Sequence, residues 1–370
     1  MSGFDTDVFV VGGGPAGLAA ALAARQRGFR VTVADAMRPP IDKACGEGLM
    51  PDALLSLAEL GVPVEELCGA AFRGIRFIGP EQAVESYFPS GAGLGVRRLH
   101  LHERMVRQAE AAGVQFLWAT PIRGLRGSEV LLDSGAVRAR WIVGADGQNS
   151  LVRKWASLDG GRVLERRIGL RRHFAVKPWS EFVEVYWGER GQAYVSSVGE
   201  REVCVATISK SKFPSFETGL EDFPQLRARL GDAQPTTTAR GAVTVTRRLR
   251  SVFRGNVALI GEASGSVDAI TGEGLAMAFR QALALADALA AANLARYAEA
   301  HRRISSLPDF MARAMLLMDK SGWVKRRALT AMARRPELFG HWLAIHVGQQ
   351  PPRVLGRGGV LDSGWQLLTA

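Results

Sequence analysis

Cysteine is scarce in this sequence. The 370 residues contain three, Cys45, Cys68 and Cys204, which lie far apart and show neither Cys-x-x-Cys nor His-rich spacing. This distribution argues against a disulfide framework and against a zinc site, so we expect no metal. Unpaired cysteines suit a reducing compartment, and we expect a cytoplasmic protein.

Long uninterrupted apolar runs are lacking as well. The most apolar long segment, residues 274–298, is interrupted by Arg280, Asp287 and Arg296. Charges at these positions are costly in a helix that faces lipid, so the segment predicts a buried helix of a globular protein. The composition, with 47% hydrophobic and 22% charged residues, is that of a soluble chain, and the length predicts more than one domain.

Lysine is rare, although the chain is basic. Lys and Arg number 47 against 36 Asp and Glu, for a net charge of +11, and only seven of the bases are Lys. Residues 301–370 hold 11 of the basic residues and 4 of the acidic ones, so the excess is concentrated at the C-terminal end. No nucleic-acid recognition motif accompanies this charge, and we expect no nucleic-acid partner.

The basic C-terminal region has a helical pattern over residues 307–347, with Met and Trp among the Arg and Lys. Three interpretations are open: a solvated helical subdomain, a cap over a substrate tunnel, or helices in peripheral contact with an anionic membrane. Residues 349–360, rich in Pro and Gly, are expected to form an extended tail.

Glycines near the N-terminus carry the first functional motif. An apolar run at residues 8–11 leads directly into Gly12, Gly14 and Gly17, an Ala- and Leu-rich segment follows, and a second apolar run ends in Asp35. The pattern predicts strand, turn, helix and strand. Such a turn brings the backbone close to a pyrophosphate at a helix N-terminus, and the acid binds a ribose hydroxyl, so the motif predicts a dinucleotide site.

Two later segments identify the dinucleotide. Residues 141–153 contain Asp146-Gly147, and residues 257–275 contain Gly261-Glu262 and Gly272-Glu273-Gly274. With the glycine motif, and in this order, they resemble the flavoprotein superfamily that contains para-hydroxybenzoate hydroxylase and the geranylgeranyl reductases. The resemblance extends over residues 5–295. It departs from the family where Glu262 stands in place of the usual Asp.

The resemblance implies an FAD-dependent α/β oxidoreductase. Its expected fold is a three-layer ββα Rossmann-like FAD-binding domain with an inserted β-sheet substrate domain and a C-terminal helical region. We assign residues 1–75, 96–165 and 246–295 to the FAD domain, 76–95 and 166–245 to the substrate domain, and 296–370 to the C-terminal region. The residues expected to bind FAD are Gly12, Gly14, Pro15, Ala16, Gly17, Asp35, Ala36, Cys45, Gly46, Arg98, Asp146, Gly147, Gly261, Glu262, Gly272, Glu273 and Gly274.

The loop Lys43-Ala44-Cys45-Gly46-Glu47 resembles the Lys-x-Cys-Gly-Glu loop of the geranylgeranyl-reductase-like branch, which runs near the flavin ring. The aromatic Tyr-x-Trp-x-Phe-Pro signature of geranylgeranyl reductases is nevertheless missing, as is the Trp-x-Trp-x-Ile-Pro signature of flavin-dependent halogenases. Cys45 is a candidate redox or positioning residue, and the alternative is a small filler beside FAD.

Alternating patterns predict strands at residues 168–176, 182–187, 192–198 and 202–208. Alternation places Arg171 and His173 on one face of the first strand and Arg172 on the other. His173 and Tyr186 are candidate catalytic residues for activating a phenolic or enolic substrate. For each, the alternative is a packing residue of the sheet.

The sequence favours an FAD-dependent monooxygenase that hydroxylates a hydrophobic aromatic or polyketide-like molecule in secondary metabolism. The alternatives are reduction of a double bond in a prenyl or quinone lipid, halogenation, and a non-catalytic flavoprotein or membrane-associated binding module. No second glycine-rich nucleotide fold follows the first, so NADPH or NADH would bind transiently to reduce FAD, or a separate reductase would supply electrons.

Overall fold

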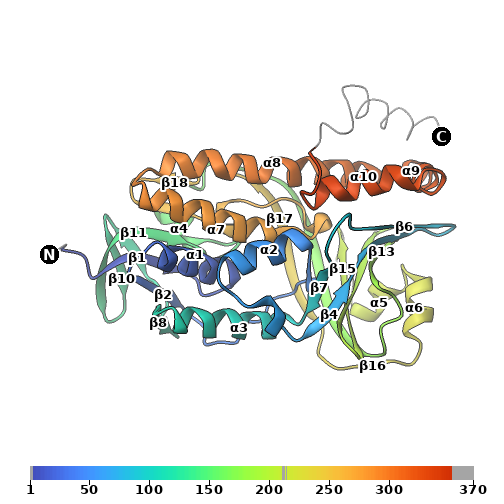
Figure 1. Cartoon of the computed structure of the whole chain (residues 1–370), viewed down its shortest axis with the longest axis horizontal. Helices are drawn as coiled ribbons and strands as arrows, with labels where there is room; N and C mark the ends of the chain where they lie inside the picture. The colour runs from blue at the N-terminus through green and yellow to red at the C-terminus, as the bar shows by residue number, and fades with distance from the viewer. Residues whose placement is uncertain (1–2, 211–212, 214, 352–370) are drawn as a thin grey trace.

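A computed structural model describes residues 3–210, 213 and 215–351 of the chain (Figure 1). The helices and short 3₁₀ turns of these residues are α1 (Pro15–Gln26), α2 (Pro51–Glu59), η1 (Val64–Glu66), α3 (Arg98–Ala111), α4 (Leu151–Trp155), α5 (Phe216–Leu220), α6 (Pro224–Leu230), η2 (Gly261–Ser264), η3 (Ala269–Thr271), α7 (Gly274–Ala290), α8 (Leu294–Asp319), α9 (Gly322–Arg334) and α10 (Pro336–His346).

The strands form two large sheets and one small sheet. Their bounds are β1 (Thr6–Val11), β2 (Val31–Asp35), β3 (Gly48–Leu49), β4 (Gly69–Phe72), β5 (Gly74–Ile78), β6 (Ala83–Tyr87), β7 (Gly93–Val96), β8 (Gln115–Trp118), β9 (Gly124–Arg126), β10 (Glu129–Leu132), β11 (Gly135–Gly144), β12 (Arg162–Ala175), β13 (Phe182–Trp187), β14 (Gly191–Gly199), β15 (Glu202–Ser209), β16 (Gln234–Pro235), β17 (Arg240–Arg248), β18 (Phe253–Arg254) and β19 (Val257–Leu259). The α/β fold expected from the sequence is confirmed.

The first large sheet has a parallel centre in the order β19, β11, β1, β2, β8. The apolar run in β1 explains its central place, because its alternating side chains are buried on both faces of the sheet. Val8 and Val10 pack with α1, α3 and α7 on one face, and Phe9 packs with β9 and β10 on the other. The result is the three-layer ββα arrangement of a Rossmann-like domain.

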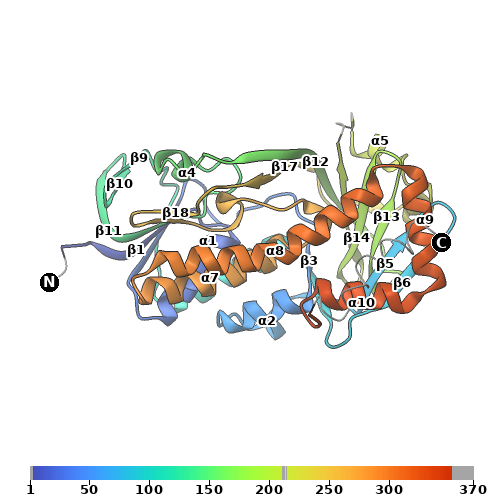
Figure 2. The same ribbon diagram turned by 90° about the horizontal axis from the view of Figure 1, so that it is seen from above.

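The second large sheet contains the four predicted strands as β12, β15, β14 and β13, in that spatial order. These predictions are confirmed, although β12 begins earlier than expected, at Arg162. From an earlier part of the chain, β5 pairs in parallel with β13, and β6 follows at the edge. Helices α5 and α6 cover one face of this sheet and α9 and α10 the other (Figure 2).

The C-terminal region is helical over residues 307–347, as the pattern predicted, in the end of α8, in α9 and in α10. Helix α8 runs along α7 beside the first sheet and continues to the second sheet, where α9 and α10 turn back over β5, β6 and β13 (Figures 1 and 2). Most of the expected extended tail, residues 352–360, lies outside the described residues.

Candidate active site

The turn between β1 and α1 allows close approach of a ligand to the backbone. Gly12 has a φ of 110°, a conformation that favours glycine. A Cβ on Gly17 would lie 1.8 Å from the carbonyl oxygen of Gly12, so only glycine lets α1 start this close to the turn. A Cβ on Gly14, in contrast, would meet nothing within 4 Å, because Gly14 faces an open cavity.

The N-terminus of α1 attracts anions. Gly14 is its N-cap and supplies no side-chain hydrogen bond, Pro15 opens the helix, and the first turn contains no acidic residue. The first-turn amide groups therefore have no side-chain partner at this end, where the helix dipole is positive. Because Gly14, Pro15 and Ala16 all line the cavity, this end of the helix suits a phosphate group.

Asp35 lies at the end of β2 beside this turn. Its two carboxylate oxygens accept hydrogen bonds from the backbone N–H groups of Gly13, at 2.7 Å, and Met37, at 2.8 Å. Both Asp35 and Ala36 line the cavity. Below them, His102 Nε2 lies 2.8 Å from the carbonyl oxygen of Gly13, and burial lowers the pKa of this histidine. His102, which the sequence analysis missed, thus fixes the glycine turn as a neutral hydrogen-bond donor.

Two charged residues on the cavity wall have polar atoms without partners. Asp146 uses Oδ2 to accept hydrogen bonds from the N–H groups of Leu151, at 2.7 Å, and Val152, at 3.1 Å, at the start of α4. Its Oδ1 is buried and unpartnered, as is Nε of Arg98 at the start of α3. Such orphaned atoms are rare unless a ligand satisfies them. A donor and an acceptor on one wall fit a ligand that carries both phosphates and hydroxyl groups.

The segment around Gly261 closes another side of the cavity. Glu262 in η2 lines it, and its carboxylate accepts a hydrogen bond from Nζ of Lys43 in the loop after β2. The extra methylene of Glu262 therefore does not remove the carboxylate from the cavity, but it brings it to Lys43, which the sequence analysis did not assign to the site. Gly147 is a neighbour of this carboxylate, since a Cβ on Gly147 would lie 3.9 Å from Glu262 Oε2.

The N-terminus of α7 forms the next part of the wall. Gly272 has a φ of 70° in the left-handed region, Glu273 is the N-cap, and a Cβ on Gly274 would meet nothing within 4 Å. Gly46, in the loop after β2, is equally open, because a Cβ on it would also meet nothing within 4 Å. Gly46, Gly272 and Gly274 line the cavity. Without side chains at these positions, a ligand ring can approach the backbone closely.

The cavity has a volume of about 1250 Å³ and passes from the first sheet to the second. Its far part lies between the second sheet and the C-terminal helices, and is lined there mainly by apolar side chains. These include Phe77, Val183, Val185, Met311, Met315, Met318, Val324, Ala328, Met332, Phe339 and Leu343. Of the three interpretations of the basic C-terminal region, a cap over a substrate tunnel therefore matches its position.

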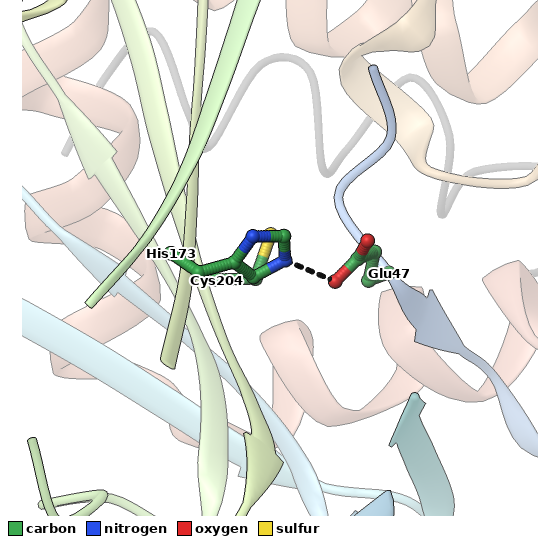
Figure 3. A group of neighbouring side chains, drawn as sticks. All are labelled: Glu47, His173 and Cys204. Carbon is green, nitrogen blue, oxygen red and sulfur yellow. Dashed lines mark hydrogen bonds and ion pairs between the residues drawn. The ribbon is translucent and has the colours of Figure 1, made fainter. Parts of the chain in front are cut away.

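A buried carboxylate–imidazole pair lies where the two parts of the cavity meet. Glu47, with a φ of 59°, lines the cavity and is 4% exposed. Its Oε2 accepts a hydrogen bond from Nε2 of His173 at 2.7 Å (Figure 3). Nδ1 of His173 faces Nη1 of Arg171, 3.2 Å away, and since an arginine can only donate, Nδ1 is the accepting nitrogen. His173 stands behind Glu47 and positions it.

Cys45 and Cys204 have different surroundings. Cys45 lines the cavity, whereas Cys204 lies beside His173 and Glu47 and donates weakly from its thiol to the carbonyl oxygen of Cys45, at 3.7 Å (Figure 3). Burial raises the pKa of the Cys204 thiol well above its ordinary value. The ligand-type atoms of Glu47, His173 and Cys204 lie within 4.8 Å of one another, and Oε2 of Glu47 and Nε2 of His173 are bonded to each other.

Tyr186 has to be corrected as a catalytic candidate. It points to the face of β13 that packs on α5 and α6, and its hydroxyl donates to Glu184 at 2.7 Å. Its neighbours Val183 and Val185, on the opposite face, line the cavity, and Tyr186 does not. The tyrosine that reaches the cavity is Tyr194 on β14, whose hydroxyl donates to the carbonyl oxygen of Ile270 at 2.9 Å.

Sequence comparison gives a family and several relatives. A family model described as "FAD binding domain" matches residues 5–300. A menaquinone reductase of Mycobacterium tuberculosis is 29% identical over 328 residues, which is 78% of each chain. A digeranylgeranylglycerophospholipid reductase of Methanocella arvoryzae is 26% identical over 73% of each chain. A rifampicin monooxygenase of Streptomyces venezuelae is 32% identical over 162 residues, 40% of this chain and 33% of its own.

Structural comparison agrees on the fold. A flavoprotein/dehydrogenase from Cytophaga hutchinsonii superposes with a TM-score of 0.80 at 17% identity, covering 98% of this chain and 97% of its own. Among the described residues, no helix combines the length and apolar character needed to cross a membrane.

Proposed function

This chain belongs to the FAD-binding domain family of oxidoreductases, and from that premise we propose that it reduces an isolated double bond in a long prenyl or quinone lipid. The observation that carries the proposal is the apolar part of the cavity under α8, α9 and α10, which offers a hydrophobic chain a channel that continues from the cofactor part. The relatives that cover about three quarters of this chain are named as reductases of such lipids.

FAD would be held by residues of the first sheet and its turns. The N-terminus of α1 with Gly14, and the partnerless Arg98 Nε, suit the phosphates, while Asp35 suits a ribose hydroxyl. Gly46, Gly272 and Gly274 leave room for the flavin ring. When bound, FAD supplies two-electron redox chemistry, and we propose that NADPH or NADH renews its reduced form by transient binding.

The remaining residues shape the substrate end. Met315, Met318 and Met332 have flexible, polarisable side chains that can adapt to an extended hydrocarbon chain and exclude water from it. Glu47, held by His173, presents a buried carboxyl group to the cavity. We propose that it orients the polar end of the substrate, or a proton, where the two parts of the cavity meet.

Monooxygenation is the second candidate. It was the function favoured by the sequence, and the Glu47–His173 pair supports it, because a carboxylate backed by an imidazole can take the proton of a phenolic or enolic substrate. The relatedness to a rifampicin monooxygenase is confined to 40% of the chain, whereas both reductase relatives cover much more of it. Reduction is therefore the better-supported reaction.

The two candidates differ in their need for oxygen. The FAD-loaded protein is incubated with dithionite or NADPH and either menaquinone or digeranylgeranylglycerophospholipid in detergent, once without and once with oxygen, and products are resolved by mass spectrometry. Double-bond reduction predicts a gain of two hydrogens without oxygen, measured for menaquinone after the ring has been reoxidised to the quinone, because dithionite alone converts the quinone to the quinol. An added oxygen atom that appears only in air would instead establish monooxygenation, and a protein that takes up no FAD would overturn both. Gly14→Val, expected to lack FAD, is the control.

A further inference from the structure

Four ionisable side chains meet behind the N-terminus of α7. They are Asp52 from α2, Glu273 and Arg280 from α7, and His346 from α10. Arg280 Nη2 lies 3.5 Å from Asp52 Oδ2 and 3.9 Å from Glu273 Oε1, and His346 Nδ1 lies 3.5 Å from Glu273 Oε2. The side chains of Glu273 and His346 are 2% and 7% exposed.

Each of the four has a buried atom without a hydrogen-bond partner: Asp52 Oδ2, Glu273 Oε2, Arg280 Nη2 and His346 Nδ1. Four such atoms in one cluster are unusual, because an unsatisfied buried polar group costs about 1–3 kcal/mol. Whether these four atoms are satisfied depends on which of the side chains carry protons.

The hydrogen bond of His346 defines its protonation. Nε2 lies 3.1 Å from the carbonyl oxygen of Thr271, which can only accept, so Nε2 carries a proton. In a neutral ring Nδ1 is then an acceptor. It faces Glu273 Oε2, and an ionised carboxylate is also an acceptor, so the two would not bond. One proton between Nδ1 and Oε2 satisfies both atoms at once.

The burial of Glu273 and His346 favours a proton shared between them. Burial raises the pKa of Glu273 to about 8, and burial also lowers the pKa of His346 and raises that of Asp52. A protonated Glu273 facing a neutral His346 agrees with the directions of these pKa shifts. When the proton leaves, the charge on Glu273 is stabilised by Arg280 and by the N-terminus of α7, where Glu273 is the N-cap.

We propose that Glu273 and His346 hold one transferable proton in the wall of the cavity. His346 itself lines the cavity together with Thr271, Gly272 and Gly274. The inference rests on the proposed function, because saturating a carbon–carbon double bond consumes a hydride and a proton. The hydride is supplied by the reduced cofactor. The pair gives its one shared proton to the substrate carbon, Glu273 is left as a carboxylate, and Nε2 of His346 keeps its hydrogen bond to the carbonyl oxygen of Thr271.

Asp52 and Arg280 mark the route by which this proton returns. Their side chains are 15% and 30% exposed, against 2% for Glu273, so they connect the buried pair with solvent. The pair is thus bordered by the cavity at His346 and connected to the more exposed Asp52 through Arg280.

The protonation itself is tested spectroscopically on the FAD-loaded full chain. Infrared spectra near neutral pH should show the carbonyl band of a protonated carboxyl group, which disappears as the pH is raised through about 8. The band should be lost in Glu273→Gln and kept in Glu337→Gln, which changes an exposed residue of α10. Nitrogen-15 spectra, assigned with His346→Gln, should show His346 protonated on Nε2.

A doubly protonated His346 facing a carboxylate would also place one proton in the pair and would uphold the proposal. Absence of the carboxyl band together with a singly protonated ring would overturn it, because the pair would then hold no transferable proton.

The transfer is tested by anaerobic single turnover of the reduced enzyme with digeranylgeranylglycerophospholipid, which has no quinone ring that could take up the electrons instead. Glu273, expected from the sequence to bind FAD, does not line the cavity, unlike its neighbours Gly272 and Gly274. Glu273→Gln should therefore retain wild-type FAD content, react at least about 10-fold more slowly, and lose the decline of rate above about pH 8. An unchanged rate and pH profile would overturn the donor role. If the wild-type enzyme reduces neither menaquinone nor digeranylgeranylglycerophospholipid, the proposed function fails, and the infrared and nitrogen-15 spectra together still decide whether the pair holds a proton.

Discussion

Arg167 donates a hydrogen bond from Nη1 to Oδ1 of Asp268 at 3.0 Å, deep inside the protein, where the two side chains are 0% and 2% exposed. Arg167 belongs to β12 of the second sheet, and Asp268 is the N-cap of η3, beside the cavity. Arg167 also donates to the side chain of Gln192 and to the carbonyl oxygen of Ile208. The pair thus joins β12 of the second sheet to the segment before η3, beside the cavity.

Arg167→Met should lower the free energy of unfolding by about 3–5 kcal/mol, since it leaves the carboxylate of Asp268 buried without its partner. Urea unfolding monitored by fluorescence measures the change. Arg166→Met, at the exposed neighbouring position of β12, should change stability by less than about 0.5 kcal/mol. Equal losses in the two variants would contradict a special role for the buried pair.

Two glycines of the first turn should respond differently to alanine or valine. Gly14→Val adds a side chain where the backbone conformation and the open space permit it, so stability should stay within about 0.5 kcal/mol of wild type while FAD is no longer retained. Gly17→Ala meets the carbonyl oxygen of Gly12 at 1.8 Å and should destabilise the protein even without FAD. Flavin absorbance and thermal unfolding of each apoprotein separate the two effects.

Met332→Trp should block the apolar part of the cavity without disturbing the cofactor part. Met332 is 6% exposed, lines the cavity and lies on α9, away from the turn at Gly14. We expect unchanged FAD content and a loss of at least about 10-fold in turnover of a long prenyl substrate, because a bulky ring fills the channel. Met332→Leu, which conserves volume, is the matched control. Wild-type turnover in Met332→Trp would place the substrate elsewhere.

His301 should make the protein less stable as the pH falls. Its Nε2 bonds with Ser264 Oγ at 2.9 Å, and burial lowers its pKa from 6.5 to about 4. Between these values the unfolded chain binds a proton that the folded one does not. The contribution is therefore complete above pH 6.5 and is lost as the pH falls towards 4, by on the order of 1–3 kcal/mol.

His301→Gln should flatten this part of the stability curve, measured by urea unfolding over the same pH range. His100→Gln, at an exposed position of α3, should leave the slope unchanged. A wild-type slope in His301→Gln would show that another group causes the acid sensitivity.

The C-terminal helices carry a proposed membrane contact that vesicles can test. Leu317 and Trp323 are 56% and 51% exposed, Leu317 also lines the cavity, and Arg327 lies over the ring of Trp323. Apolar side chains among bases suit an anionic bilayer, from which a lipid substrate could enter the cavity. Sedimentation with phosphatidylserine vesicles should fall in Leu317→Ser/Trp323→Ser and with added salt. Binding that the double variant retains would exclude this surface.

The sequence predicted those parts of the site that are close together along the chain. The spacing of Gly12, Gly14, Gly17 and Asp35 follows from one strand–turn–helix–strand unit, so the structure places all four around one turn. The pairing of Glu47 with His173 joins residues 126 positions apart and depends on how the loop after β2 meets the second sheet. Strand alternation could place Arg171 and His173 on one face, but it could not supply their partner.

The choice of Tyr186 shows a second limit. Every residue of β13 is buried, because helices cover both faces of the second sheet. Period-2 alternation then separates two faces without indicating which one borders a cavity. His346 was out of reach for a related reason. It lies in a basic helical region whose pattern predicts helices, but not the element on which they pack.

Helix α8 carries Pro308 inside its 26 residues. At 1.5 Å per residue the helix is about 39 Å long, and it spans from the first sheet to the second. Proline has no N–H to donate to the carbonyl oxygen of Ile304, so α8 resists bending least at that turn. A bend between the two sheets would therefore be concentrated at one turn of α8, and Pro308→Ala would restore the missing donor and stiffen the helix there.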